Sequence, residues 1–145
     1  MAFFRRSSVI GAVVAIGACS ASSAPVNVLE VNVPAAVFER IGAPATATVP
    51  FTVINRGSSS VFVARCGDRV MAALDRWNGH SWVQYSGDAC QANLITAGLE
   101  LTPGSSATAS RSVLEPGKYR LRIGATDAAS GAFDWATVSR GLEVR

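Results

Sequence analysis

Apolar and polar residues alternate with a period of two along most of the chain after residue 25. The alternation is clearest over residues 118–125, where Tyr119, Leu121 and Ile123 point inward and Lys118, Arg120 and Arg122 point outward. A period of two is that of a β-strand with one buried face, because successive side chains lie on opposite sides of a sheet. This segment therefore predicts a strand whose basic side chains face solvent.

Further segments share this pattern, and glycine, proline and asparagine turn signals separate them. We expect strands at residues 26–33, 46–55, 60–65, 107–114 and 133–144, and two more between residues 70 and 85. The last strand breaks its alternation once, which indicates a bulge. No segment shows a sustained helical period. About seven short strands joined by turns predict an all-β fold, an antiparallel sandwich.

The strongest turn signal lies within residues 70–85. The sequence Trp77-Asn78-Gly79-His80 places Asn-Gly between two strands, and this pair favours a tight hairpin because both residues tolerate positive φ. Trp77 and Trp82 then lie nearly opposite each other and can pair across the strands.

The segment from Leu114 to Leu121, LEPGKYRL, resembles the approach to strand F of immunoglobulin-like and fibronectin type III-like domains. In these families a tyrosine hydroxyl bonds back to the preceding corner, and the residue two positions further on is buried. The resemblance assigns these places to Tyr119 and Leu121. It implies an immunoglobulin-like β-sandwich over residues 26–145, without the inter-sheet disulfide of antibodies. It implies no particular function, because this architecture serves many.

The start of the chain has a different pattern. An uncharged run from Val9 to Ala18 follows Arg5 and Arg6, and small and polar residues come after it. This is the order of a signal peptide. Ten residues span about 15 Å as a helix, roughly half the hydrocarbon thickness of a bilayer, so the run is too short to remain as a membrane span. We therefore expect the protein to be exported.

The end of this run, Ile16-Gly17-Ala18-Cys19, resembles the bacterial lipobox, in which an aliphatic residue and two small residues precede an obligatory cysteine. The resemblance implies that residues 1–18 are removed as a lipoprotein signal peptide. It further implies that Cys19 carries acyl chains, with residues 19–25 as a lipidated tether. Two or three acyl chains hold a protein to a bilayer where one is marginal. The implied location is a bacterial cell membrane, inner or outer, facing the periplasm or the exterior.

Two alternatives for the leader remain open. Ordinary signal cleavage near Ala21 or Ala24 would release a soluble exported protein, although Pro25 disfavours the second position. Arg5 and Arg6 would also suit a twin-arginine export route, although the residues that follow them depart from its usual pattern.

Composition limits the partners and the cysteine chemistry. Removing residues 1–18 leaves 127 of the 145 residues, enough for one domain with a single core. The formal charge of +3 includes Arg5 and Arg6, so the mature chain carries +1, which argues against a nucleic-acid partner. Cys66 and Cys90 form an even pair in an oxidising compartment and are expected to be joined by a disulfide.

The sequence contains no complete catalytic or metal-binding set. His80 is the single histidine, in a predicted exposed turn, and no G-x-S-x-G motif offers a nucleophile. Structural zinc and copper sites fail because too few ligands are present. The aspartates near loops are interpreted as solvated acids rather than a calcium or carboxylate site: Asp68, Asp75, Asp88, Asp127 and Asp134. We therefore expect a protein that is not an enzyme and uses no cofactor.

The aromatic side chains of the 70–85 hairpin are the candidate partner-binding residues: Trp77, Trp82 and Tyr85. Exposed tryptophan can stack on sugars or anchor a protein, although these rings can also simply cover a small core. The leading hypothesis is a lipid-anchored envelope module that binds a protein or a glycan without catalysis. A second hypothesis is an extracytoplasmic protease inhibitor that presents Arg69 or Arg76 from a disulfide-braced loop. A third is an enzyme with an unrecognised carboxylate site.

Overall fold

The computed structural model describes residues 28–87, 89–90, 98–128, 132–133 and 135–145. Every regular element in these ranges is a strand, which confirms the predicted all-β class. The strands are β1 (Leu29–Asn32), β2 (Val37–Phe38), β3 (Ala47–Asn55), β4 (Val61–Val63), β5 (Arg65–Cys66), β6 (Arg69–Val70), β7 (Ala73–Trp77), β8 (Trp82–Ser86), β9 (Leu99–Leu101), β10 (Ser106–Val113), β11 (Gly117–Thr126), β12 (Trp135–Val138) and β13 (Leu142–Val144).

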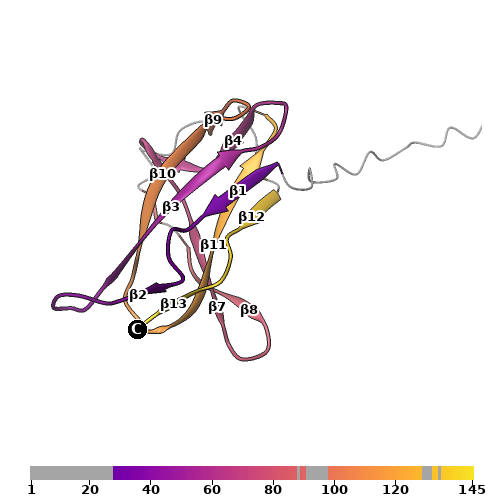
Figure 1. Cartoon of the computed structure of the whole chain (residues 1–145). Coiled ribbons are helices and arrows are strands. Elements are labelled where there is room, and N and C mark those ends of the chain that lie inside the picture. The colour runs from indigo at the N-terminus through magenta and orange to yellow at the C-terminus, as the bar shows by residue number, and fades with distance from the viewer. Residues whose placement is uncertain (1–27, 88, 91–97, 129–131, 134) are drawn as a thin grey trace, which may run out of the picture.

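The strands form two main sheets and one small hairpin (Figure 1). In the smaller sheet, β3 lies between β1 and β10, and all pairings are antiparallel. The larger sheet is built around β11, which pairs with β12 and β13 along one edge and with β4 and β7 along the other. This sheet continues with β8 beside β7, β9 beside β4, and β2 in parallel beside β13.

The hydrophobic core lies between the two main sheets. The smaller sheet contributes alternate residues of β3, among them Val49 and Phe51, and the larger sheet contributes Tyr119, Leu121 and Ile123 of β11. Each of these side chains is at most 1% exposed, so the alternation read from the sequence marks the buried face. Burying such side chains is the main favourable contribution to folding, at about 25 cal/mol per Å² of apolar surface.

Two neighbouring strands of the larger sheet are interrupted at the same level. β4 and β7 follow one line along β11, and β5 and β6 form a separate hairpin between them. β8 and β9 follow the next line, on the outer side of β7 and β4. Cys66 in β5 is bonded to Cys90, which lies between β8 and β9. The predicted disulfide is confirmed, and it links the β5–β6 hairpin to the segment that follows β8.

The last strand is divided at the expected break in its alternation, between β12 and β13. Ser139 lies at the break and is buried. Its backbone N–H donates to the Leu121 carbonyl at 2.9 Å, and its hydroxyl oxygen accepts the Leu121 N–H at 2.9 Å. The serine side chain therefore supplies the acceptor for a backbone N–H of β11 at the point where the pairing between the strands is interrupted.

The two ends of the molecule carry different elements. β1 begins at Leu29, opposite Asn55 at the end of β3. The loop between β7 and β8 follows Trp77, beyond the pairing of Arg76 with Tyr119 near the start of β11. β1 therefore begins at the end opposite the β7–β8 hairpin, and Figure 1 shows this hairpin projecting at the end that holds the C-terminus.

Candidate functional site

The tip of the β7–β8 hairpin is organised by Asn78. Its side-chain oxygen accepts the backbone N–H groups of His80 and Ser81, both at 2.9 Å, and Gly79 takes a φ of 103°. The hairpin loop thus holds four residues, from 78 to 81, rather than the tight two-residue turn that Asn-Gly predicted. The side-chain bonds of Asn78 support the wider loop. His80 is exposed there, as predicted.

Trp77 and Trp82 form the first residue pair below this loop. They are directly opposite in register, and their ring centroids are 5.4 Å apart with a tilt of 58°. Both rings are partly exposed. The predicted cross-strand tryptophan pair is therefore present.

The two tryptophans belong to the side of the larger sheet that faces away from the core, which we call the outer face: Asp75, Trp77, Trp82, Gln84, Lys118, Arg120, Arg122 and Glu143. Arg120 and Arg122 alternate along β11 with buried Tyr119 and Leu121, so they must point outward. On the neighbouring strand, Asp75 lies opposite Arg120. The predicted outward direction of the arginines is confirmed.

Asp75 is buried at the centre of the outer face, which corrects its interpretation as a solvated loop acid. It is 4% exposed and lies within strand β7. Its two carboxylate oxygens accept the Nε–H groups of Arg120 at 3.1 Å and Arg122 at 3.2 Å. Arg122 also donates from Nη2 to Gln84 Oε1 at 2.8 Å. Two guanidinium groups compensate for the burial of one carboxylate.

Arg120 also fixes the position of Trp82. Its guanidinium carbon lies over the indole ring, 5.0 Å from the centroid, a cation–π arrangement. Beyond Trp82 is a hollow of about 330 Å³, whose lining comes from four separate segments: Ala36, Val37, Trp82, Lys118, Gly141, Leu142 and Glu143. A hydrogen bond from Arg145 lowers the pKa of the Glu143 carboxyl, so this acid is charged and engaged with its neighbour.

Tyr85 does not join this surface. It packs against the core and meets Tyr119 edge-on, with ring centroids 5.3 Å apart. Burial raises the pKa of Tyr85, and it raises the pKa of Tyr119 to about 12. Arg76 lies over both rings and forms an ion pair with Glu115 at 2.8 Å. Of the three predicted binding residues, the structure brings Trp77 and Trp82 together and places Tyr85 on the opposite face of the sheet.

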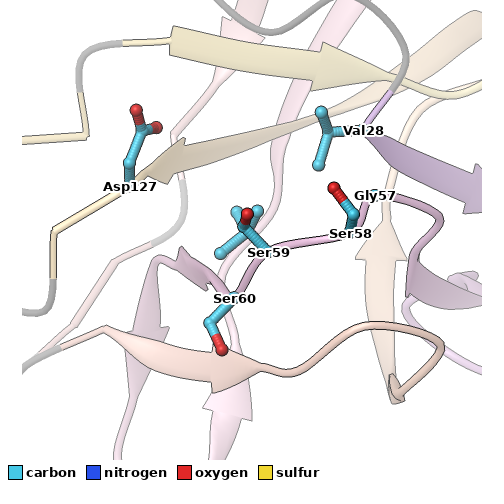
Figure 2. Close-up of a pocket in the computed structure, with 7 residues that line it drawn as sticks. Val28, Gly57, Ser58, Ser59, Ser60 and Asp127 are labelled. Carbon is cyan, nitrogen blue, oxygen red and sulfur yellow. The ribbon is translucent and has the colours of Figure 1, made fainter.

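A second hollow, of about 410 Å³, lies at the end of the molecule where β1 begins (Figure 2). Serines of the β3–β4 loop line it, and Figure 2 shows Asp127 and Val28 at its borders. Buried Asn55 holds this loop, since its side-chain NH₂ donates to the carbonyls of Ser59 at 2.8 Å and Leu101 at 2.7 Å. Within the described ranges, no group of three or more His, Cys, Asp or Glu side chains could hold a metal ion.

Other predicted residues lie elsewhere. Arg69 is exposed in β6, beside the disulfide, and Asp68 is exposed in the turn before it. Cys19 and residues 1–18, the predicted signal peptide, lie outside the described residues, as do Asp88 and Asp134. No helix in the part of the chain that the structure describes could span a bilayer.

Neither a protein-family model nor a curated protein sequence matches this chain. Among solved structures, it is similar to the Pseudomonas fluorescens alkylpurine DNA glycosylase AlkC bound to DNA containing an abasic site analog, with a TM-score of 0.35 and 13% sequence identity. The match covers 81% of this chain and 30% of the glycosylase chain. A likeness at this level carries no argument about function, so the candidate site depends on its own geometry.

Proposed function

We propose that this protein is a lipid-anchored lipoprotein of the bacterial cell envelope whose immunoglobulin-like domain binds a partner through the outer face, without catalysis. The fold assignment is supported by a tyrosine corner. The Tyr119 hydroxyl donates to the Glu115 carbonyl at 3.1 Å, and Tyr119 and Leu121 are fully buried. The strand order β1-β3-β10 in one sheet and β8-β7-β11-β12 in the other agrees with a sandwich of this family.

The proposed anchor at Cys19 is compatible with the direction in which the domain presents its outer face. From Cys19 to the start of β1 the chain can span roughly 30 Å at about 3.3 Å per residue when fully extended. β1 begins at the end opposite the β7–β8 hairpin. An anchored domain would therefore direct Trp77 and Trp82 away from the membrane, toward partners in the periplasm or outside the cell.

The binding proposal is supported mainly by one observation: Trp82 and Arg120 are partly exposed, yet neighbouring side chains hold both of them in place. Trp82 is held between Arg120 and Trp77, and Arg120 is held by Asp75. Side chains that are already ordered before binding lose little conformational entropy when a partner docks. Tryptophan and arginine are also the residues that most often dominate binding energy in protein interfaces. The hollow beside Trp82 offers room for one partner side chain.

Alanine substitution of the tryptophans tests the binding proposal. We expect Trp82→Ala, alone or with Trp77→Ala, to reduce cross-linking of the mature protein to envelope components. Ile41→Ala is the matched control, because Ile41 is a large apolar side chain, 78% exposed, outside the outer face. Thermal unfolding of each variant separates lost binding from lost folding. Unchanged cross-linking in a folded Trp82→Ala variant would contradict the proposal.

The anchor has a separate test, the intact mass of the mature protein taken from membranes. We expect a chain that starts at Cys19 and carries acyl groups, and we expect Cys19→Ala to prevent this processing. A chain that starts near residue 22 or 25 without acyl groups would refute the anchor and leave a soluble exported binding module.

A further inference from the structure

The centre of the outer face carries more positive than negative charge. Arg120 and Arg122 share the single carboxylate of Asp75, and each reaches it through Nε. Nη2 of Arg122 has a second partner, Gln84. Within the described residues, neither Nη group of Arg120 donates a hydrogen bond. A partly exposed guanidinium therefore keeps two donor groups for a ligand.

Arg120 is also held in a defined orientation. Its Nε donates to Asp75, and its guanidinium carbon lies over the Trp82 ring, 5.0 Å from the centroid. Two parallel N–H donors in a fixed plane match the two oxygens of a carboxylate, and such charge-assisted bidentate bonds are among the strongest hydrogen bonds in proteins. The fixed geometry reduces the entropy lost on binding.

The hollow next to Trp82 adds an apolar requirement. Val37 and Trp82 contribute apolar surface to its wall, and Lys118 adds another positive charge nearby. The nearby acid, Glu143, is paired with Arg145 at 2.9 Å and its charge is thereby partly neutralised. The surface thus combines an anion site with an adjacent apolar recess.

We propose that the outer face binds an acidic protein segment. A glutamate or aspartate side chain pairs with Arg120, and a neighbouring apolar side chain of the same segment enters the hollow beside Trp82. This inference rests on the proposed binding function and specifies its partner. A protein segment is favoured over a glycan because the surface pairs the donors of Arg120 with the apolar wall of the hollow beside Trp82, and a segment with an acidic and an apolar side chain meets both requirements. The membrane surface is disfavoured as a partner because the proposed anchor precedes β1, and the hairpin lies at the end of the domain opposite the start of β1.

The test uses the mature protein and a synthetic peptide in which glutamate alternates with leucine, measured by calorimetry and tryptophan fluorescence at physiological salt. Its analogue with glutamine in place of glutamate isolates the carboxylate. We expect the analogue to bind about tenfold more weakly, and Arg120→Gln to weaken binding of the glutamate peptide by a similar factor. Arg120→Lys should also weaken it, because an ammonium cannot make two parallel bonds. Arg56→Gln, which removes an exposed arginine paired with Glu30 in the smaller sheet, should have no effect.

Several outcomes would overturn the inference: no binding of the glutamate peptide, equal binding of the two peptides, or equal effects of Arg120→Gln and Arg56→Gln. Tighter binding to polygalacturonate would assign the face to an acidic glycan instead, and tighter binding to phosphatidylglycerol vesicles would assign it to lipid. If Trp82→Ala abolishes envelope cross-linking while Arg120→Gln preserves it, the binding function stands and the carboxylate assignment fails. If neither change affects cross-linking, both fail.

Discussion

Asp75 is the residue whose replacement tests the architecture of the outer face most directly. Asp75→Asn keeps the shape of the side chain but removes its charge and one of its two acceptor oxygens. Breaking a fully buried ion pair costs roughly 3–5 kcal/mol, and an exposed pair contributes at most about 1 kcal/mol. The Asp75 side chain is 6% exposed, but its partners Arg120 and Arg122 are 27% and 35% exposed and can regain water. We therefore expect an intermediate loss, about 2 kcal/mol of unfolding free energy.

Urea unfolding followed by circular dichroism measures this loss, with Glu30→Gln as the matched control. The control removes the same charge from an ion pair with a shorter distance, 2.8 Å against 3.1 Å and 3.2 Å. Glu30 and Arg56 are 48% and 56% exposed, so we expect the control to cost about 0.5 kcal/mol or less and to depend more on salt. Tryptophan fluorescence should change only in Asp75→Asn, because Arg120 is then released from its position over Trp82. An equal or larger loss in Glu30→Gln would refute the reasoning that burial, rather than distance, determines the cost.

Three further predictions concern the rest of the domain. Burial raises the pKa of Tyr119 from the ordinary 10.0 to about 12, so between pH 10 and 12 the folded state keeps a proton that the unfolded state has lost. The free energy of unfolding should therefore fall as the pH rises through this range, by up to about 1.4 kcal/mol per pH unit. Titrating urea stability against pH should show a smaller slope in Tyr119→Phe, with the remainder due to Tyr85, whose pKa burial also raises, and the variant should cost about 1 kcal/mol at neutral pH. An unchanged slope would exclude Tyr119 as its source. Replacing Cys66 and Cys90 together by alanine should lower the free energy of unfolding by about 3.5 kcal/mol, because the loop-closure constraint on the unfolded chain is lost. The circular dichroism of the folded state should stay the same. A loss of strand signal would show that the disulfide is needed to form the sheets. Asn55→Ala should cost about 3 kcal/mol, because three hydrogen bonds to the backbone are lost, one of them buried and two partly buried. A loss below about 1 kcal/mol in urea unfolding would contradict this.

The sequence predicts the parts of this fold that depend on local pattern or on counting. The alternation around Tyr119 and Leu121 identifies the central strand and its buried face. With Cys19 assigned to the expected lipobox, two cysteines remain, and the expectation of export is enough to predict their disulfide, because exported chains tend to oxidise their thiols. The turn signal predicts that Trp77 and Trp82 lie opposite each other, and the structure confirms this although the loop is wider than predicted.

The candidate site itself depends on contacts between distant residues, which a local pattern cannot show. Asp75 reads as a polar residue near a turn, and its burial follows only from Arg120 and Arg122, which are 45 and 47 positions away. The hollow beside Trp82 is likewise assembled from four separate segments. Strands of two or three residues, such as β5 and β9, are too short to establish a period. Tyr85 lies three positions after Trp82 in β8, so strand alternation already places it on the opposite face; the prediction grouped the three aromatic residues by hairpin and not by face.

The placement of β1 at one end and of the hairpin at the other determines how the domain would respond to a pulling force. A force applied between Leu29 and Trp82 acts along the strands, so the hydrogen bonds between β1 and β3 are sheared together rather than opened one after another. The first residues are held by additional bonds: the Arg56 N–H donates to the Val28 carbonyl at 2.7 Å, and the Thr137 hydroxyl donates to the Leu29 carbonyl at 3.1 Å. This geometry would give the proposed N-terminal anchor mechanical resistance in the direction in which a partner at the proposed binding face would pull.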